Sequence, residues 1–240
     1  MISQYFDRYI TMKAKICRKA WDKEFTYDKM GPKFMIKLRL AKSADMEDFY
    51  VIAHATGNVG ADASHIYGDQ KILGHVYAAP YLTLMPDLCF VAEDEKGVAG
   101  YVVGAPDSAG FEALMEKHWW PDLRAAYEAP DIEKKDSWSA EKGLIDRIFH
   151  PSHLYSELAE AYPAHVHLNL LPRIQGQGIG PKLFDLWWKT ARELGVKKCH
   201  VGVSPKNEGA VKFWKKCGFS SLEGKVDLPP VRTLWLGQDA

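Results

Sequence analysis

A glycine-rich segment at residues 175–180, QGQGIG, constrains the fold of this chain more than any other feature of its sequence. It lies between an apolar run and a long amphipathic segment, so Gly176, Gly178 and Gly180 fall at the start of a predicted helix. Glycine in a helix costs about 1 kcal/mol relative to alanine, but it lets the backbone approach a ligand closely. Because the first turn of a helix also presents free N–H groups, the segment is either a pyrophosphate-binding turn or a tight strand-to-helix turn without a ligand.

Strands and helices alternate on both sides of this segment. Apolar and β-branched runs at 165–171, 198–204 and 231–236 predict strands. An amphipathic helix is predicted over 180–194, and a second one follows Asn207, whose side chain is a good helix cap. The alternation indicates an α/β (α+β) domain in which helices flank a sheet.

The earlier part of the chain carries the same kinds of signal. The run IKLRLA at 36–41 predicts a strand, and Ser43 is the expected cap of the helix that follows. The runs at 88–94 and 97–105 predict two neighbouring strands of a hairpin, because only a short polar turn separates them.

Two further segments interrupt this alternation. Residues 106–164 are rich in tryptophan, histidine and charge, and we expect a helical insertion there, with helices near 111–127 and 140–149. Residues 1–35 predict an amphipathic helical extension that packs on the main domain or on a second copy of the chain, as in a homodimer. The main domain is expected to span 36–240.

The composition argues against several classes of protein. The 31 basic residues balance the 31 acidic ones, so nothing favours a nucleic-acid partner. No apolar run is long enough to span a membrane, and the N-terminus lacks the apolar core of a secretion signal, so we expect a cytoplasmic protein. The four cysteines form no C-x-x-C pair, so we expect no metal site and no dithiol motif.

Two motifs, in this order, resemble the acetyl-CoA core of the GNAT acyltransferases. Gln175, Gly178 and Gly180 take the first, fourth and sixth places of the family's Q/R-x-x-G-x-G/A pattern. A second block follows the next strand and consists of Asn207, Ala210, Phe213, Trp214, Gly218 and Phe219. The resemblance covers 165–219 and implies the GNAT fold, a central mixed, twisted sheet flanked by helices. The stretches ATGNVGADASHIYGD, LGHVYAAPYL and YPAHVHLNLLP are similar to the acetyltransferase-like domain of protein O-GlcNAcases.

The resemblance implies that acetyl-CoA is the co-substrate and that the glycine-rich turn binds its pyrophosphate. The end of the preceding strand would offer backbone groups to the acetyl carbonyl and the pantetheine arm. Arg173 or Lys182 would add positive charge, or would simply be solvated. Asn207 would contact the pantetheine arm in addition to capping its helix. The residues implied for the coenzyme are Leu168, Asn169, Leu170, Leu171, Arg173, Gln175, Gly176, Gln177, Gly178, Ile179, Gly180, Asn207 and Trp214.

The sequence departs from the family's pattern at Trp214. Many members carry a tyrosine there, whose hydroxyl can protonate the leaving thiolate, whereas an indole N–H has no usable acidity. His165 and His167, which strand alternation places on one face with Asn169, are candidate general bases because imidazole titrates near neutrality. The alternative is that both pack against the insertion. Tyr162 is a third candidate for a catalytic role.

The acceptor side of the site carries weaker signals. An amine needs a negative or aromatic wall, and Asp62, Tyr67, Asp107 and Trp120 lie in segments that flank the cleft in this fold. Asp62 could equally cap a turn, and the adjacent Trp119 and Trp120 could anchor the insertion to the core.

These features together favour an acetyl-CoA-dependent N-acetyltransferase that acts on a primary amine, either a small molecule or a protein lysine. Because no cysteine lies in a recognisable nucleophile setting, we expect direct attack in a ternary complex. The alternative is a catalytically silent relative that keeps the fold and binds a peptide or a coenzyme. Trp214 is the residue that keeps this alternative open.

Overall fold

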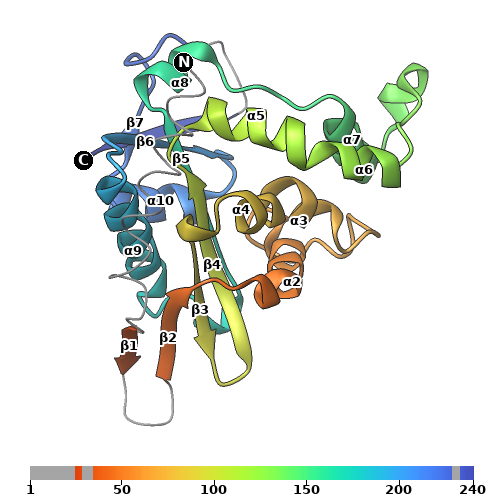
Figure 1. Ribbon diagram of the computed structural model, residues 1–240. Helices are drawn as coiled ribbons and strands as arrows, with labels where there is room; N and C mark the ends of the chain where they lie inside the picture. The colour runs from red at the N-terminus through yellow and green to blue at the C-terminus, as the bar shows by residue number, and fades with distance from the viewer. Residues whose placement is uncertain (1–24, 29–34, 229–232) are drawn as a thin grey trace.

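The computed structural model describes residues 25–28, 35–228 and 233–240 and arranges them around one mixed sheet with helices on both faces (Figure 1). Eight strands form this sheet in the order β1-β2-β3-β4-β5-β6-β8-β7. Their bounds are Phe25–Asp28 (β1), Met35–Leu40 (β2), Cys89–Asp94 (β3), Gly97–Ala105 (β4), Ala164–Leu170 (β5), Lys198–Val203 (β6), Ser220–Ser221 (β7) and Leu234–Asp239 (β8).

One junction in the sheet differs from the others. Strands β1 to β4 each pair antiparallel with the next strand, and β8 pairs antiparallel with both β6 and β7. Strand β6 instead runs parallel to β5, and within the described residues the pairing consists of Ala164–Cys199 and His165–His200. Because β5 continues to Leu170 while this pairing stops at His165, the two strands part toward their C-terminal ends.

The helices cover the two faces of the sheet. Their bounds are Met46–Thr56 (α2), Ile72–Tyr77 (α3), Ala79–Leu84 (α4), Ser108–His118 (α5), Trp120–Ala126 (α6), Ala140–Phe149 (α7), Ser156–Ala161 (α8), Ile179–Glu193 (α9) and Glu208–Lys216 (α10). Short 3₁₀ turns lie at Ser43–Asp45 (η1), Pro86–Leu88 (η2), Ile132–Ser137 (η3) and Pro172–Ile174 (η4). Figure 1 shows α9 and α10 on one side of the sheet and α2 to α4 on the other.

Alternate side chains of β3 and β4 enter two separate cores. Val102 of β4 packs in the core that contains Phe184 of α9 and Trp214 of α10. Its neighbour Tyr101 points to the opposite core, where its ring stacks on Phe49 of α2 at a centroid distance of 4.7 Å. This period of two follows from the pleat of a strand. Because Phe49 and Trp214 belong to different cores, α2 and α10 lie on opposite faces of the sheet.

The predicted elements of the main domain are largely confirmed. The hairpin is β3 and β4, the strand before the glycine-rich segment is β5, and the amphipathic helix after it is α9. The predicted cap at Asn207 is also confirmed, because its Oδ1 accepts a 3.0 Å hydrogen bond from the N–H of Ala210. Between 106 and 164 the helices are α5 to α8, where the sequence indicated two helical stretches.

Two local predictions were wrong. Ser43 does not cap the following helix; a 3₁₀ turn intervenes, and Asp45 precedes α2. The Asp45 carboxylate accepts from the N–H of Lys42 and pairs with Arg39 at 2.7 Å. Asp45, and not Ser43, therefore stabilises this turn. In the predicted helical extension, residues 25–28 form strand β1. The rest of the predicted extension, residues 1–24 and 29–34, lies outside the described residues.

The described helices are short. None of those within 25–28, 35–228 and 233–240 combines the length and the apolar character that crossing a membrane requires.

Candidate active site

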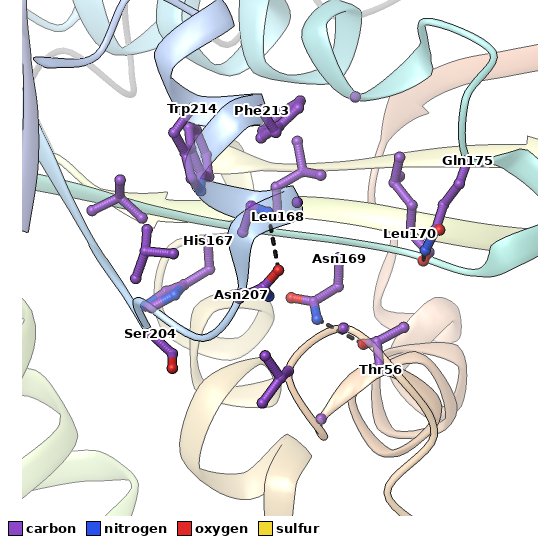
Figure 2. Close-up of a pocket in the computed structure, with 18 of the residues that line it drawn as sticks. Thr56, His167, Leu168, Asn169, Leu170, Gln175, Ser204, Asn207, Phe213 and Trp214 are labelled. Carbon is purple, nitrogen blue, oxygen red and sulfur yellow. Dashed lines mark hydrogen bonds between the residues drawn. The ribbon is translucent and has the colours of Figure 1, made fainter. Parts of the chain in front are cut away.

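A cavity of about 1030 Å³ lies where β5 and β6 part. Its walls come from both sides of the sheet: α2 and the loop after it, Tyr77 of α3 and Leu144 of α7 on one side, and the glycine-rich segment and α10 on the other. Figure 2 shows His167, Asn169, Asn207 and Trp214 gathered around this space. The cavity therefore extends from the N-terminus of α9 to helices α2, α3 and α7.

Strand β5 presents part of its backbone to the cavity. The N–H of Leu171 donates to the carbonyl of Ala99 at 2.7 Å, so in this antiparallel pair the alternate residues Leu171 and Asn169 direct their backbone groups toward β4. The backbone groups of Leu168 and Leu170 consequently point the other way, into the gap. The Leu170 carbonyl accepts the side-chain amide of Gln175 at 2.7 Å, while Leu168 lies where the strands have separated.

The glycines of the turn before α9 have two different physical roles. Gly176 and Gly178 have φ values of +71° and +76°, which L side chains rarely adopt, and a Cβ at either would meet no atom within 4 Å. They therefore set the backbone path beside open space. Gly180 instead makes room for α10, since a Cβ there would lie 2.7 Å from the ring of Phe213.

The N-terminus of α9 is suited to an anion. Gly178 occupies the N-cap and has no side chain that could bond to the first turn. The N–H groups of that turn have no partner inside the helix, and the helix dipole makes this end positive. Gly176, Gly178 and Gly180 all line the cavity, so these groups border the space that a phosphate would fill.

Helix α10 contributes an amide, an aromatic ring and a charge. Asn207 uses its Oδ1 to cap the helix, which leaves its Nδ2 beside the cavity. Trp214 is buried edge-to-face against Phe213 and Phe219, at 4.9 and 5.0 Å between ring centroids, and part of it lines the cavity. Lys216 is exposed at the rim, and no described carboxylate lies within ion-pair distance of its ammonium group.

His167 is the histidine that lines the cavity. Its ring lies edge-on to Tyr81, at 5.6 Å between centroids, and its nitrogens have no hydrogen-bond partner among the described residues. Burial lowers the pKa of His167 to about 4. The imidazole is therefore neutral near neutral pH, with a lone pair available for a proton.

His165, two residues earlier, has both ring nitrogens engaged. Ser108 donates its hydroxyl proton to the carbonyl of Pro163, so its oxygen accepts from Nδ1 of His165 at 2.7 Å. Nε2 of His165 then accepts from the hydroxyl of Tyr81, also at 2.7 Å. Burial lowers the pKa of His165 well below its usual range. This arrangement matches the alternative in which His165 packs against the insertion. Neither ring nitrogen is left to take a proton from an amine substrate.

The remaining wall of the cavity is aromatic and polar without negative charge. Tyr67, Tyr77 and Tyr101 line it from three different segments. Thr56 accepts a 2.6 Å hydrogen bond from Nδ2 of Asn169 and donates its own proton to a backbone carbonyl of α2. Within the described part of the chain, the lining contains no aspartate or glutamate.

Several residues implied for the coenzyme lie away from the cavity lining. The guanidinium of Arg173 pairs with Asp94 at 2.7 Å and also donates to two carbonyls of the β3–β4 hairpin, which is a structural role. The amide of Gln177 donates to the carbonyl of Arg173 at 2.9 Å. Leu171 directs its backbone N–H toward β4. None of these three is among the lining residues, and Lys182 is not among them either.

The structure also separates most of the other predicted residues from the cavity. Tyr162 packs against Leu222 in a small core near α8, and its carbonyl accepts from His200. Asp62 is exposed and accepts from the N–H and hydroxyl of Ser64, so it caps a turn. Of the four acceptor-side residues predicted, Tyr67 lies in the lining.

The residues singled out in the insertion lie in the core or at a helix end, and none of them lines the cavity. Trp120 is buried in the core that covers α2 to α7, and the indole of Trp119 donates to the carbonyl of His75 at 2.9 Å. Asp107 precedes α5 as its N-cap residue, without a side-chain cap bond. These tryptophans therefore anchor the insertion, as one of the two interpretations of the sequence proposed.

Three lining residues have no signal in the sequence that singles them out. Thr56 reaches the cavity because it ends α2, Tyr101 because it lies opposite Asn169 in the β4–β5 register, and Lys216 because it lies in the last turn of α10. In the same described residues, no cluster of three or more histidine, cysteine, aspartate or glutamate side chains could hold a metal ion.

A mixed sheet that opens between two parallel strands beside an uncapped, glycine-rich helix N-terminus defines the site of an acetyltransferase. The chain belongs to the Acetyltransferase (GNAT) family, whose pattern matches residues 61–219. Acetyl-CoA is the acetyl donor of this family, and the predicted GNAT fold is confirmed.

Individual relatives agree with this assignment. The crystal structure of SsHAT superimposes with a TM-score of 0.77 at 30% identity, covering 85% of this chain and 98% of that one. The crystal structure of PH1933 from Pyrococcus horikoshii has a TM-score of 0.51 at 14% identity, covering 85% of this chain and 98% of that one, which shows the fold alone. The protein O-GlcNAcases of Rattus norvegicus and Mus musculus are 24% identical over 158 residues, which is 64% of this chain and 17% of their length. The chain thus corresponds to a small part of those relatives.

Proposed function

We propose that the protein transfers the acetyl group of acetyl-CoA to a primary amine, by direct attack within a ternary complex. One observation carries the proposal: a single cavity joins the glycine-rich turn, the outward backbone of Leu168 and the open imidazole of His167. A phosphate site, a donor for a developing oxyanion and a base are the three groups that this reaction needs. Their order along the cavity matches a coenzyme that enters at α9 and ends near β5.

The residues of the cavity fit the coenzyme. The turn of Gly176 and Gly178 and the N-terminus of α9 would bind its pyrophosphate, because their N–H groups and the helix dipole favour an anion. Lys216 would pair with a phosphate at the rim. Asn207, the carbonyl of Leu168 and the N–H of Leu170 would bond the amides of the pantetheine arm, and Trp214 would pack along it.

The chain's own groups account for most of the chemistry. When the amine nitrogen bonds to the acetyl carbon, the carbon–sulfur bond breaks, the amine loses a proton and the sulfur gains one. The N–H of Leu168 would stabilise the negative charge on the acetyl oxygen. His167 would accept the proton of the amine, since its neutral ring faces the cavity without another partner.

Direct attack is favoured over an acyl-enzyme route. Cys89 and Cys199 are buried in the cores, and burial raises the pKa of each thiol, so neither is a thiolate. Cys217 is half-buried, and burial raises its pKa to about 11. None of these three cysteines is among the residues that line the cavity.

Trp214 leaves the protonation of sulfur to another group. Its indole N–H is a donor without usable acidity, so water or a phenol such as Tyr101 would have to supply the proton. If no group does so, the protein is a silent relative that binds the coenzyme without turnover.

A two-part experiment tests the proposal. Saturating acetyl-CoA should raise the melting temperature, because a ligand that binds only the folded state stabilises it by mass action. Release of free thiol from acetyl-CoA should then depend on an added amine, across a panel of alkylamines, arylalkylamines, amino sugars and lysine peptides. A melting temperature that does not respond to acetyl-CoA would refute the coenzyme site. A shift without thiol release on any amine would favour the silent relative.

A further inference from the structure

The turn that follows α2 and lines the cavity has an unusual residue at its tip. Asn58 and Ala61 exchange two backbone hydrogen bonds, of 3.0 and 2.8 Å, so Val59 and Gly60 are the central residues of a two-residue turn. Both have positive φ, +54° for Val59 and +90° for Gly60. Positive φ at both central positions is the signature of a type I′ turn, in which asparagine, aspartate or glycine normally comes first.

Valine is poorly suited to this position. A β-branched side chain at positive φ crowds its own backbone, and such a residue is a genuine outlier. Val59 is the one non-glycine residue with positive φ among the described residues. Its side chain is 46% exposed, so burial in a core does not account for its presence either. A strained, exposed apolar residue of this kind is typical of a functional contact.

The turn lies close to the opposite wall of the cavity. Val59, Gly60 and Ala61 all line the cavity, and a Cβ at Gly60 would lie 3.6 Å from Nδ2 of Asn207. The turn thus reaches from the end of α2 to the N-cap of α10. Val59 and His167, the proposed base, line the same cavity.

The electrostatic character of the same wall is consistent with an apolar ligand body. The lining is formed by Tyr67, Tyr77 and aliphatic side chains such as Leu73 and Leu144, without a carboxylate in the described chain. Behind this wall, the guanidinium of Arg147 donates to the hydroxyl of Tyr77 at 2.7 Å.

Nearby carboxylates have other partners. Asp62 accepts from Ser64, and Glu141 accepts from the N–H of Asp69 at 2.8 Å. Neither is in the lining. A second ammonium group on the acceptor would therefore enter this wall without a counter-charge, which is costly when the charge is removed from water.

We infer that Val59 contacts the body of the acceptor, and that the acceptor is a small amine with one positive charge and an aromatic or apolar body. This inference rests on the proposed function. Polyamines and strongly basic peptides are disfavoured by the same wall. Val59 is thus a specificity-determining residue.

Two substitutions at one position separate shape from charge. Val59→Asn fits the turn better and adds no charge, whereas Val59→Asp has nearly the same shape and adds a carboxylate to the lining. The matched acceptors are hexylamine and hexanediamine, which have the same chain and differ by one ammonium group, with phenylethylamine as the aromatic member. Val51→Asp, at an exposed apolar position of α2 outside the lining, controls for added charge alone.

The wild-type protein should prefer hexylamine and phenylethylamine to hexanediamine by about tenfold in kcat/KM. Val59→Asn should raise the melting temperature by about 2–4 °C and lower kcat/KM for hexylamine about threefold to tenfold. Relative to Val59→Asn, Val59→Asp should shift the preference toward hexanediamine about threefold to fivefold, and Val51→Asp should not shift it.

Binding of the same three amines to the protein saturated with acetyl-CoA or CoA is measured in parallel, by calorimetry. This readout keeps the inference testable if the protein has no turnover. Hexanediamine binding to wild type as tightly as hexylamine would overturn the inference whether or not thiol is released. Equal preferences in Val59→Asn and Val59→Asp would also overturn it. If the amines bind with the expected preferences but no thiol is released, the proposed function fails and the inference about Val59 stands.

Discussion

Asn169 of β5 and Thr56 of α2 are joined by a 2.6 Å hydrogen bond across the cavity, in which the side-chain amide donates to the hydroxyl (Figure 2). The Thr56 hydroxyl in turn donates to the carbonyl of Ile52 at 2.6 Å, so its own proton is committed to the helix. With its NH₂ group held in this way, Asn169 keeps its amide oxygen as an acceptor. The pair fixes the end of α2 against β5, the strand that lines the cavity.

The first prediction concerns this pair. Thr56→Val keeps the side-chain shape and removes the hydroxyl, which leaves the amide of Asn169 without its partner in a partly buried place. The free energy of unfolding should fall by about 1–3 kcal/mol, measured by urea denaturation. Thr56→Ser, which keeps the hydroxyl, is the matched control and should lose much less. Equal losses in the two variants would show that packing, and not the hydrogen bond, matters here.

The second prediction concerns the charge at the rim of the coenzyme site. Lys216→Ala should weaken acetyl-CoA binding severalfold and reduce its dependence on salt, because one phosphate contact is lost. Lys215→Ala, at an exposed neighbouring position outside the lining, should bind like wild type. Titration calorimetry at two salt concentrations measures both effects. The same affinity loss in both variants would point to general surface charge instead.

The third prediction concerns Trp214. Trp214→Tyr should bind acetyl-CoA and keep or raise turnover, because a phenol can donate a proton to the departing sulfur. Trp214→Phe should keep much of the activity if the indole only packs along the coenzyme. Both variants should lose about 1–3 kcal/mol of stability, since the ring is buried among Phe184, Phe213 and Phe219. If Trp214→Phe abolishes turnover while acetyl-CoA still binds, the indole itself takes part in catalysis.

The fourth prediction concerns the proposed base. His167→Ala should lower kcat about 100-fold with little change in the affinity for acetyl-CoA. The loss should shrink at high pH, where more of the amine is already free of its extra proton. Because the pKa of His167 is about 4, the pH profile of wild-type kcat should show no ionisation of this histidine between about pH 6 and about pH 9. His150→Ala, at an exposed position away from the lining, should behave like wild type.

The fifth prediction concerns stability and pH. Burial lowers the pKa of His200 to about 4, and an unfolded histidine has a pKa of about 6.5. Between these values the unfolded chain binds a proton that the folded chain does not. The free energy of unfolding should therefore fall as the pH drops from about 6.5 to about 4, by about 1.4 kcal/mol per pH unit for one such group.

The control for this pH effect is a variant that does not titrate. His200→Asn keeps a donor for the Tyr162 carbonyl and should flatten the slope by about one proton. His118→Asn, at an exposed position, should leave the slope unchanged. Urea denaturation at several pH values gives the comparison, and a slope in His200→Asn equal to that of wild type would contradict the assignment.

The sequence predicted those parts of the fold that depend on short-range patterns. The strand at β5, the helix α9 and the cap at Asn207 all follow from periodicity, glycine placement or a single side chain next to a helix. The same local patterns, matched to a family, pointed to the glycine-rich turn, which lines the cavity; that it binds the coenzyme stays a prediction. Such signals survive because they are decided within a few residues.

Other parts of the site depend on contacts between distant segments. His165 and His167 lie on one face of β5, as alternation predicted, yet only tertiary contacts distinguish them: Ser108 and Tyr81 engage the first and leave the second open. Ser43 was predicted to cap a helix, but Arg39 holds Asp45 in that turn. Val59 carries no special signal in the sequence, because its importance lies in a backbone angle.

The short junction between β5 and β6 has a consequence for how the molecule opens. Two residue pairs, Ala164–Cys199 and His165–His200, are all that connect the antiparallel half of the sheet to the β6-β8-β7 half by strand pairing within the described residues. Although one core packs against both halves, this strand junction is the weak point of the sheet, and in the free protein the amides of β6 should exchange with solvent before those of β3 and β4. A coenzyme that bonds to both strands would replace the missing ladder, so that the two halves melt as one and exchange slows on both sides of the gap.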